Sequence, residues 1–266
     1  INRHWKTDRT AFAPLTGDAL TEMKALVQAC RGDLPAELPR VVACLVGYFA
    51  YETIGLVEKL PRPAPNPLGL PDMLFVRPTL VLVFDRLSDQ LFIVAPLWPE
   101  GMEPARQVAA AIDQIEPAAA RLAQPLPAPA RAGSLESLPD PTPVLPEGRY
   151  AEMVLKAKDY IEAGDIFQVV LAQRFTLDFP LPAFDLYRAL RRINPSPFLY
   201  HLDMPGFALT GSSPEILVRA RDGEVTIRPI AGTRPRGKTA LEDAENRASL
   251  LADPKERAEH LMLIDL

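Results

Sequence analysis

The sequence predicts an α+β fold, in which runs of consecutive strands are separated by helices. Two patterns indicate this class. From residue 150 to 161, apolar residues recur at the spacing of one helix face. Elsewhere, apolar and β-branched runs such as 74–85 and 90–95 follow one another directly, which permits antiparallel sheets. The 266 residues are 48% hydrophobic, which is enough to fill a sizeable core.

The first half of the chain is expected to contain two helices and three strands. The helices cover 18–30 and 103–122, and the strands cover 41–50, 74–85 and 90–95, the last two joined by a turn at 86–89. Five prolines between residues 61 and 71 predict an extended surface loop. A second proline-rich segment, at 125–147, is expected to be a linker between a partial α+β region at 1–124 and a second region at 148–266.

The second region alternates helices with strands and hairpins. The expected elements are a helix at 150–161 closed by Gly164, a strand at 165–177, a helix at 184–193, strand pairs 198–203 with 206–210 and 216–219 with 224–228, and a final helix capped by Asp253. On the strand at 165–177, Gln168 would lie among apolar neighbours, so its amide would need a hydrogen-bond partner.

Charge and cysteine usage exclude several classes of protein. Lys and Arg total 29 against 34 Asp and Glu, a net charge of -5, so the chain lacks the basic footprint of a nucleic-acid-binding protein. Cys30 and Cys44 do not have the spacing of metal ligands, and they are expected to be free thiols in a reducing compartment. No apolar run is long enough to cross a membrane and the start lacks a signal-peptide pattern, so we expect a soluble cytoplasmic protein.

Both ends are interpreted as cut from a longer chain. Ile1 is not an initiator methionine, and the last predicted helix, which starts at Asp253 and Pro254, shows no stop signal before Leu266. We therefore expect a fragment.

The segment at 229–237 predicts a loop that meets an anion. Pro229 ends the preceding strand because proline has no N–H to donate, and Gly232 allows a ligand to approach the backbone closely. Arg234 and Arg236 can pair with a carboxylate or phosphate through two hydrogen bonds each. An ordinary basic turn is the alternative interpretation of this segment taken alone.

Five segments in the second half resemble, in order, the successive motifs of the chorismate-utilising enzymes, and most closely those of the large subunits (component I) of anthranilate synthases. They are residues 164–175, 194–198, 211–215, 229–237 and 256–261. The resemblance covers 150–266 strongly and the first half more weakly, through 7–15 and 47–52. It implies two layered, mainly antiparallel β-sheets with helices packed outside, and it makes 148–266 the N-terminal portion of a chorismate-binding catalytic domain.

Two positions narrow the reaction that the resemblance implies. Relatives that add water to chorismate have a lysine at the position of Gln168, and an uncharged amide cannot act as a general base. Aminodeoxychorismate synthases typically have a nucleophilic lysine where this chain has Ala231. Direct attack by ammonia is therefore the expected chemistry, and aminodeoxychorismate synthase is the alternative enzyme.

The resemblance also implies a role for each matching residue. Glu215 matches the general acid that protonates the departing 4-hydroxyl of chorismate, a role that requires burial or a nearby negative charge. Gly232 and Thr233 match positions that contact chorismate, and Glu259 matches the first of two glutamates that hold Mg²⁺. Taken alone, Glu215 would be a surface ion-pair residue and Glu259 part of a solvated helix face.

Regulation and partners follow from the same resemblance. Pro197, Phe198 and Leu199 match contact positions of a tryptophan feedback site, although residues 194–197 alone would be a helix-stopping turn. A glutamine amidotransferase subunit (component II) would supply the ammonia. Because further family motifs would lie beyond Leu266, the fragment by itself is expected to be inactive, and a non-catalytic regulatory or binding fragment is the remaining alternative.

Overall fold

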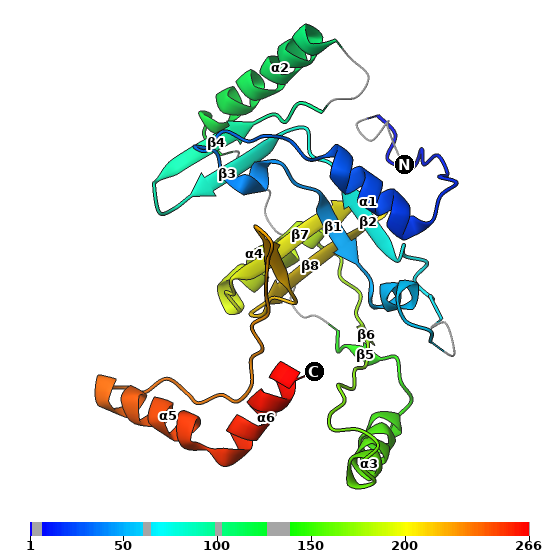
Figure 1. Cartoon of the computed structure of the whole chain (residues 1–266), viewed down its shortest axis with the longest axis vertical. Coiled ribbons are helices and arrows are strands. Elements are labelled where there is room, and N and C mark those ends of the chain that lie inside the picture. Colours follow the sequence, from blue (N-terminus) through cyan, green and yellow to red (C-terminus); the bar gives the residue numbers. More distant parts are fainter. Residues whose placement is uncertain (2–6, 61–64, 99–102, 127–138, 266) are drawn as a thin grey trace. The chain divides into compact units, whose positions relative to one another are not determined.

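The computed structural model describes residues 1, 7–60, 65–98, 103–126 and 139–265 (Figure 1). The chain divides into two compact units, Ile1–Pro129 and Ala130–Leu266, and the boundary lies inside the proline-rich segment. Each unit is described by itself. The predicted loop at 61–71 and linker at 125–147 lie partly outside the described residues.

The first unit contains the two predicted helices. Helix α1 (Ala19–Ala29) begins where the Asp18 carboxylate accepts a hydrogen bond of 3.0 Å from the Thr21 N–H, which satisfies one of the unpaired donors of the first turn. Helix α2 (Pro104–Leu122) has proline at its first position, where no N–H is needed. Two short 3₁₀ helices, η1 (Arg40–Val42) and η2 (Tyr51–Leu56), complete the helical segments of this unit's described residues.

The strands of the first unit form two antiparallel pairs. Strand β1 (Val46–Phe49) pairs with β2 (Met73–Val76), and β3 (Val81–Asp85) pairs with β4 (Gln90–Val94). The prediction of one strand at 74–85 is wrong, because the run is two strands of different pairs with Pro78 between them, a residue that cannot donate to a ladder. The strand predicted at 41–50 is shorter, since its first residues belong to η1.

The second unit confirms the predicted helices and the long hairpin. Helix α3 (Arg149–Glu162) ends before Gly164, whose φ of 79° is the left-handed conformation common after helices. Helix α4 (Ala183–Ile193) precedes the hairpin of β7 (Phe198–Met204) and β8 (Phe207–Ser213), which pair from Phe198 opposite Ser213 to Met204 opposite Phe207. Ring contacts between α4 and β7 connect Phe184 and Tyr187 to His201.

The strand predicted at 165–177 is mostly wrong. Within this run the structure has only β6 (Phe175–Thr176), which pairs with β5 (Thr142–Pro143) inside the predicted linker. A strand needs hydrogen-bonding partners along its length, and β5 offers this run a two-residue partner. Gln168 consequently lies outside a strand and is exposed, so the expected burial among apolar neighbours is wrong.

The remaining elements form a short hairpin and two helices. Strands β9 (Arg219–Arg221) and β10 (Glu224–Thr226) pair across the predicted turn, in which Asp222 and Gly223 have φ of 53° and 81°. Helices α5 (Ala240–Ala252) and α6 (Pro254–Asp265) follow. Helix α5 is not among the predicted elements, although Thr239 and Glu242 carry the spacing of a capping box.

The α+β class is confirmed, because helices are combined with strand pairs that are all antiparallel among the described residues. How the pairs stack into layers stays a prediction. Within the described part of the chain, Val42 and Met204 are the buried hydrophobic side chains. None of the described helices is both long enough and apolar enough to span a membrane.

Candidate active site

Glu215 lies just beyond the end of β8 and contacts the loop that precedes Gly232. Its carboxylate accepts a hydrogen bond of 3.1 Å from the Ile230 N–H, and its own N–H donates to the Ser213 hydroxyl at 3.3 Å. The Glu215 side chain is exposed, so the described residues do not supply the burial that its predicted acid role requires. The contact that the structure gives this carboxylate is the hydrogen bond from the Ile230 N–H.

The loop at 229–237 presents the two residues predicted to bind substrate. Gly232 is half-buried with a φ of 37°, and Thr233 is exposed. The close backbone approach that the sequence predicted at Gly232 is made by a protein side chain, because a Cβ at this position would collide with the carboxylate of Glu256.

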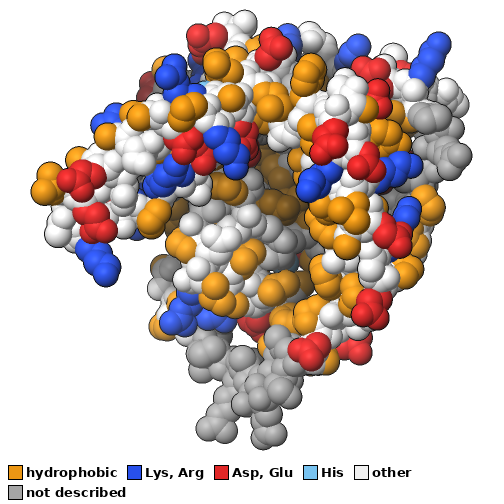
Figure 2. All heavy atoms as spheres, turned by 90° about the horizontal axis from the view of Figure 1, so that it is seen from below, with side chains coloured by type: hydrophobic (Ala, Val, Ile, Leu, Met, Phe, Trp, Pro, Cys, Tyr) orange, Lys and Arg blue, Asp and Glu red, His pale blue; other side chains and the backbone are white. Residues whose placement is uncertain are grey.

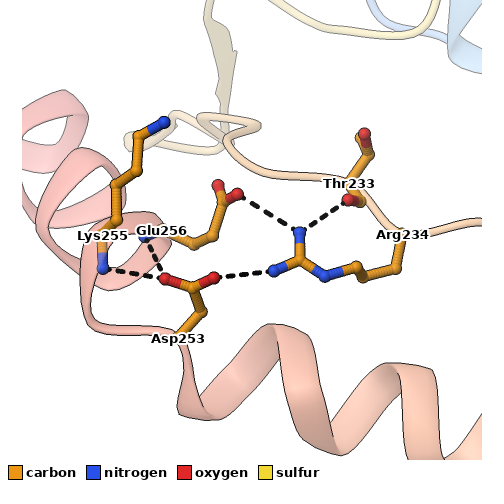
Figure 3. A network of polar contacts seen from close by, with 5 residues as sticks. All are labelled: Thr233, Arg234, Asp253, Lys255 and Glu256. Atoms are coloured by element: carbon orange, nitrogen blue, oxygen red, sulfur yellow. Dashed lines mark hydrogen bonds and ion pairs between the residues drawn. The ribbon is translucent and has the colours of Figure 1, made fainter.

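Arg234 is held by helix α6. Figure 3 shows its guanidinium between the loop and the first turn of α6, with Nη2 at 2.7 Å from Asp253 and Nη1 at 3.3 Å from Glu256. Nη1 also donates to the Thr233 carbonyl at 2.9 Å. Arg234 therefore pairs with carboxylates, as the sequence indicated, and both carboxylates belong to the chain itself. Arg236 pairs with Asp243 at 3.1 Å but is highly exposed.

Asp253 both caps α6 and binds Arg234. Its Oδ1 accepts the N–H groups of Lys255 and Glu256 at 2.9 and 3.4 Å, as the predicted N-cap requires. The pKa of Asp253 lies below its ordinary value, chiefly because the Glu256 N–H stabilises the carboxylate, with further contributions from the Lys255 N–H and Arg234.

Glu259 lies two turns into α6 on the partly covered side of the helix. Asp253, Glu256 and Glu259 recur every three residues and are all half-buried, whereas the neighbouring His260 is exposed. The solvated-face interpretation of Glu259 therefore does not describe this helix side.

The described residues contain no cluster of three or more His, Cys, Asp or Glu side chains arranged to hold a metal. Glu259 offers a half-buried carboxylate, and Mg²⁺ commonly uses only one or two carboxylates with water and substrate as the other ligands, so its role as a metal ligand stays a prediction. Cys30 and Cys44 are free thiols, and partial burial raises the pKa of Cys44.

The segment predicted to bind tryptophan adjoins the strand that leads to Glu215. Phe198 and Leu199 pair with Ser213 and Ser212. Two hydrogen bonds fasten the preceding turn to the end of β8, from the Ser196 hydroxyl to the Ser213 carbonyl at 2.6 Å and from the Ser212 hydroxyl to the Asn194 carbonyl at 2.8 Å. Pro197 and Phe198 are exposed and Leu199 is half-buried.

These contacts connect most of the predicted site segments of the second unit. The start of β7 contacts β8, β8 leads to Glu215, Glu215 contacts the loop at 229–237, and the loop contacts α6. Gln168 is not brought into this series by the described contacts. Neither Asp253 nor Glu256 was predicted from the sequence to be a partner of Arg234. The sequence shows two acids at the start of the last helix, Asp253 and Glu256, and a basic loop before it. Which basic residue they bind depends on where the backbone places the loop relative to α6.

Comparisons with known proteins identify the family of the chain. The family of chorismate binding enzymes matches residues 3–266. The chain therefore belongs to the family of chorismate binding enzymes.

Within that family, the chain is similar to proteins named anthranilate synthase component 1. It is 48% identical over 267 residues to the one from Cereibacter sphaeroides, covering 100% of this chain and 53% of that protein. It is 44% identical over 232 residues to the Thermus thermophilus protein, covering 86% of this chain and 48% of the relative.

A solved structure shows the same fold. The anthranilate synthase component I of Streptococcus pneumoniae superposes with a TM-score of 0.76 at 30% identity, over 94% of this chain and 54% of that one. This chain spans about half the length of these relatives.

Proposed function

We propose that this chain forms part of the large subunit of an anthranilate synthase, which converts chorismate and ammonia into anthranilate and pyruvate in tryptophan biosynthesis. The observation that supports the proposal is the 3.1 Å hydrogen bond from the Ile230 N–H to Glu215, because it joins Glu215 to the loop that carries Gly232 and Thr233. Relatives that are 43% and 48% identical and carry the name anthranilate synthase component 1 support it.

In the proposed reaction, the nitrogen of ammonia forms a bond to C2 of chorismate while the bond between C4 and its hydroxyl oxygen breaks. Glu215 donates the proton with which that hydroxyl leaves as water. The added nitrogen loses one proton. The bond between ring C3 and the enolpyruvyl oxygen then breaks as C2 loses its proton, which makes the ring aromatic, and a proton added to the methylene carbon of the departing group completes pyruvate. Gly232 and Thr233 hold chorismate through a backbone N–H and the threonine hydroxyl.

Two side chains indicate that the nucleophile is ammonia, because neither can support attack by water or by the enzyme itself. Gln168 cannot take a proton from water at neutral pH, and Ala231 has no atom that could attack the ring. Ammonia therefore attacks directly. We propose that a glutamine amidotransferase subunit (component II) releases this ammonia from glutamine.

Glu259 would supply one carboxylate to Mg²⁺. A bound Mg²⁺ neutralises the charge of the substrate carboxylate and orients it. Glu259 is suited to this because it is half-buried and lies one turn beyond Glu256, which packs under Gly232.

Feedback inhibition by tryptophan is proposed for Pro197, Phe198 and Leu199. Their strand pairs directly with the strand that ends before Glu215, so a ligand there acts on a segment joined to the proposed acid. Calorimetric titration of tryptophan into the full-length protein carrying this sequence checks the site. An absence of binding heat would remove this part of the proposal.

The reaction is tested with Glu215→Gln in the full-length protein carrying this sequence, supplied with chorismate, ammonium and Mg²⁺. Glutamine keeps the size of the side chain but cannot donate the carboxyl proton, so we expect kcat to fall by about 100- to 10,000-fold. Anthranilate fluorescence and mass analysis of the product are the measurements. Glu224→Gln, on the exposed β10, is the matched control and should keep its activity.

A product of 4-amino-4-deoxychorismate from the unaltered protein would contradict the proposal and identify an aminodeoxychorismate synthase. The 266-residue chain by itself is proposed to be inactive, because it spans about half of its relatives' length. Robust anthranilate formation by this chain alone would overturn that statement.

A further inference from the structure

The polar network around Arg234 joins the proposed substrate loop to the helix that carries the proposed metal ligand. Arg234, Asp253 and Glu256 have side chains that are 27%, 31% and 20% exposed, so their ion pairs are shielded from water more than an ordinary surface pair. Arg234 also donates to the carbonyl of the adjacent Thr233. One guanidinium therefore restrains both the loop backbone and α6.

Glu256 connects the same two segments a second time. Its carboxylate packs against the backbone of Gly232 so closely that a side chain at that position would collide with it. Glu256 thus contacts both Gly232 and the guanidinium of Arg234, and Figure 3 shows the second of these contacts. The loop fits onto the first turn of α6 because residue 232 has no side chain.

Helix α5 holds the following part of the loop. The Gly237 N–H donates to Asp243 at 2.9 Å and the Lys238 N–H donates to Glu242 at 2.6 Å. The Asn246 amide donates to the Pro235 carbonyl at 3.1 Å. Because the residues after Arg234 are fastened to α5, and Arg234 itself is fastened to α6, the loop cannot shift without breaking contacts to one of the helices.

We infer that Arg234 is a positioning residue that holds the chorismate-contacting Gly232 and Thr233 at a set place relative to Glu259 through its ion pairs with Asp253 and Glu256. This inference rests on the proposed function. Asp253, Glu256 and Glu259 share one side of α6, so a change in the loop's attachment to the first two alters where substrate lies relative to the third. Arg234 touches neither substrate nor metal in this role.

The test uses the full-length protein carrying this sequence and the variants Arg234→Ala, Arg234→Lys and Asp253→Asn. Lysine is a point charge and cannot bind two carboxylates in the geometry of a guanidinium. Asparagine still caps α6 but removes the negative charge that pairs with Arg234, so it separates the ion pair from the cap. Arg149→Ala is the matched control, because Arg149 forms a 3.1 Å ion pair with Glu152 that is exposed and lies on α3.

Arg234→Ala should raise the KM for chorismate and the Mg²⁺ concentration needed for half-maximal rate, with kcat/KM falling by about 10- to 100-fold. Arg234→Lys and Asp253→Asn should fall between it and the unaltered protein. Arg149→Ala should change each value by less than about twofold. Two measurements do not depend on turnover. For Arg234→Ala, calorimetry should show weaker binding of chorismate in the presence of Mg²⁺ than for the unaltered protein, and the amides at 230–238 should exchange hydrogen faster.

The inference is overturned if the unaltered protein makes anthranilate and the Arg234 variants match Arg149→Ala in KM, Mg²⁺ requirement and calorimetry. If Arg234→Ala does not fold, Arg234→Lys and Asp253→Asn decide by the same criteria. An unaltered protein that neither binds chorismate nor makes anthranilate contradicts the proposed function instead, and hydrogen exchange at 230–238 still shows whether Arg234 holds the loop.

Discussion

At the level of single residues, two arginines of the loop at 229–237 differ in how far ion pairs with the chain's own carboxylates hold them. Arg234 and Arg236 occupy the same basic loop, yet Arg234 is held by two half-buried carboxylates and Arg236 by one pair at an exposed position. Sequence alone treats them alike as anion-binding residues. Because Arg234 is more buried than Arg236, its ion pairs with Asp253 and Glu256 form a framework that holds the loop on α6.

Gly232 is the residue whose substitution tests this framework most directly. Gly232→Ala places a Cβ in the left-handed region and against Glu256, so the free energy of unfolding should fall by about 2–3 kcal/mol. Gly223→Ala is the control, because Gly223 has a φ of 81° but open space around it, and it should lose only about 1 kcal/mol from backbone strain. Urea denaturation measures both. Equal losses would show that Glu256 does not pack against Gly232.

At the scale of elements, caps and turns decide where helices start, and most of these signals are local. Asp253 is recognisable in the sequence as a helix cap because such a side chain bonds N–H groups within three residues, and the structure shows the same kind of cap at Asp18. The strand predicted at 165–177 failed for the opposite reason. Ladder partners come from distant segments, and β-branched residues at 169 and 170 do not reveal whether a partner strand is present.

The cap at Asp253 should make stability depend on pH in acid. Its pKa is lower in the folded chain than its usual 3.8, so its contribution to stability is fully present above that value and is lost as pH falls through the lower folded value. The difference in free energy of unfolding between the unaltered protein and Asp253→Asn should stay constant from about pH 7 to 5 and shrink below the usual pKa. Urea denaturation at a series of pH values checks this, and a difference that is constant throughout would contradict it.

At the scale of the whole molecule, many large apolar side chains of the described residues remain exposed, among them Tyr51, Leu87 and Leu217. Figure 2 shows hydrophobic side chains interspersed with charged ones on the face that it draws. Monomeric proteins rarely expose large contiguous apolar areas, because such areas favour association.

We therefore expect the 266-residue chain to bind the dye 8-anilinonaphthalene-1-sulfonate and to self-associate as its concentration rises. Dye fluorescence and light scattering after size exclusion measure the two effects. A protein of the relatives' length that includes this sequence is the comparison and should bind less dye per chain. Weak dye binding by a monomeric 266-residue chain would contradict the prediction.

The α+β class, most helices, the hairpins and the family could be predicted from the sequence, because they depend on local periodicity, caps, turns and motifs that neighbouring residues carry. The folded chain was needed to show that Glu215 contacts Ile230, that Arg234 binds Asp253 and Glu256, and that Gln168 lies outside a strand. These outcomes join residues that are distant in sequence or depend on a partner segment. The path of the backbone therefore determines them, and residue type alone does not.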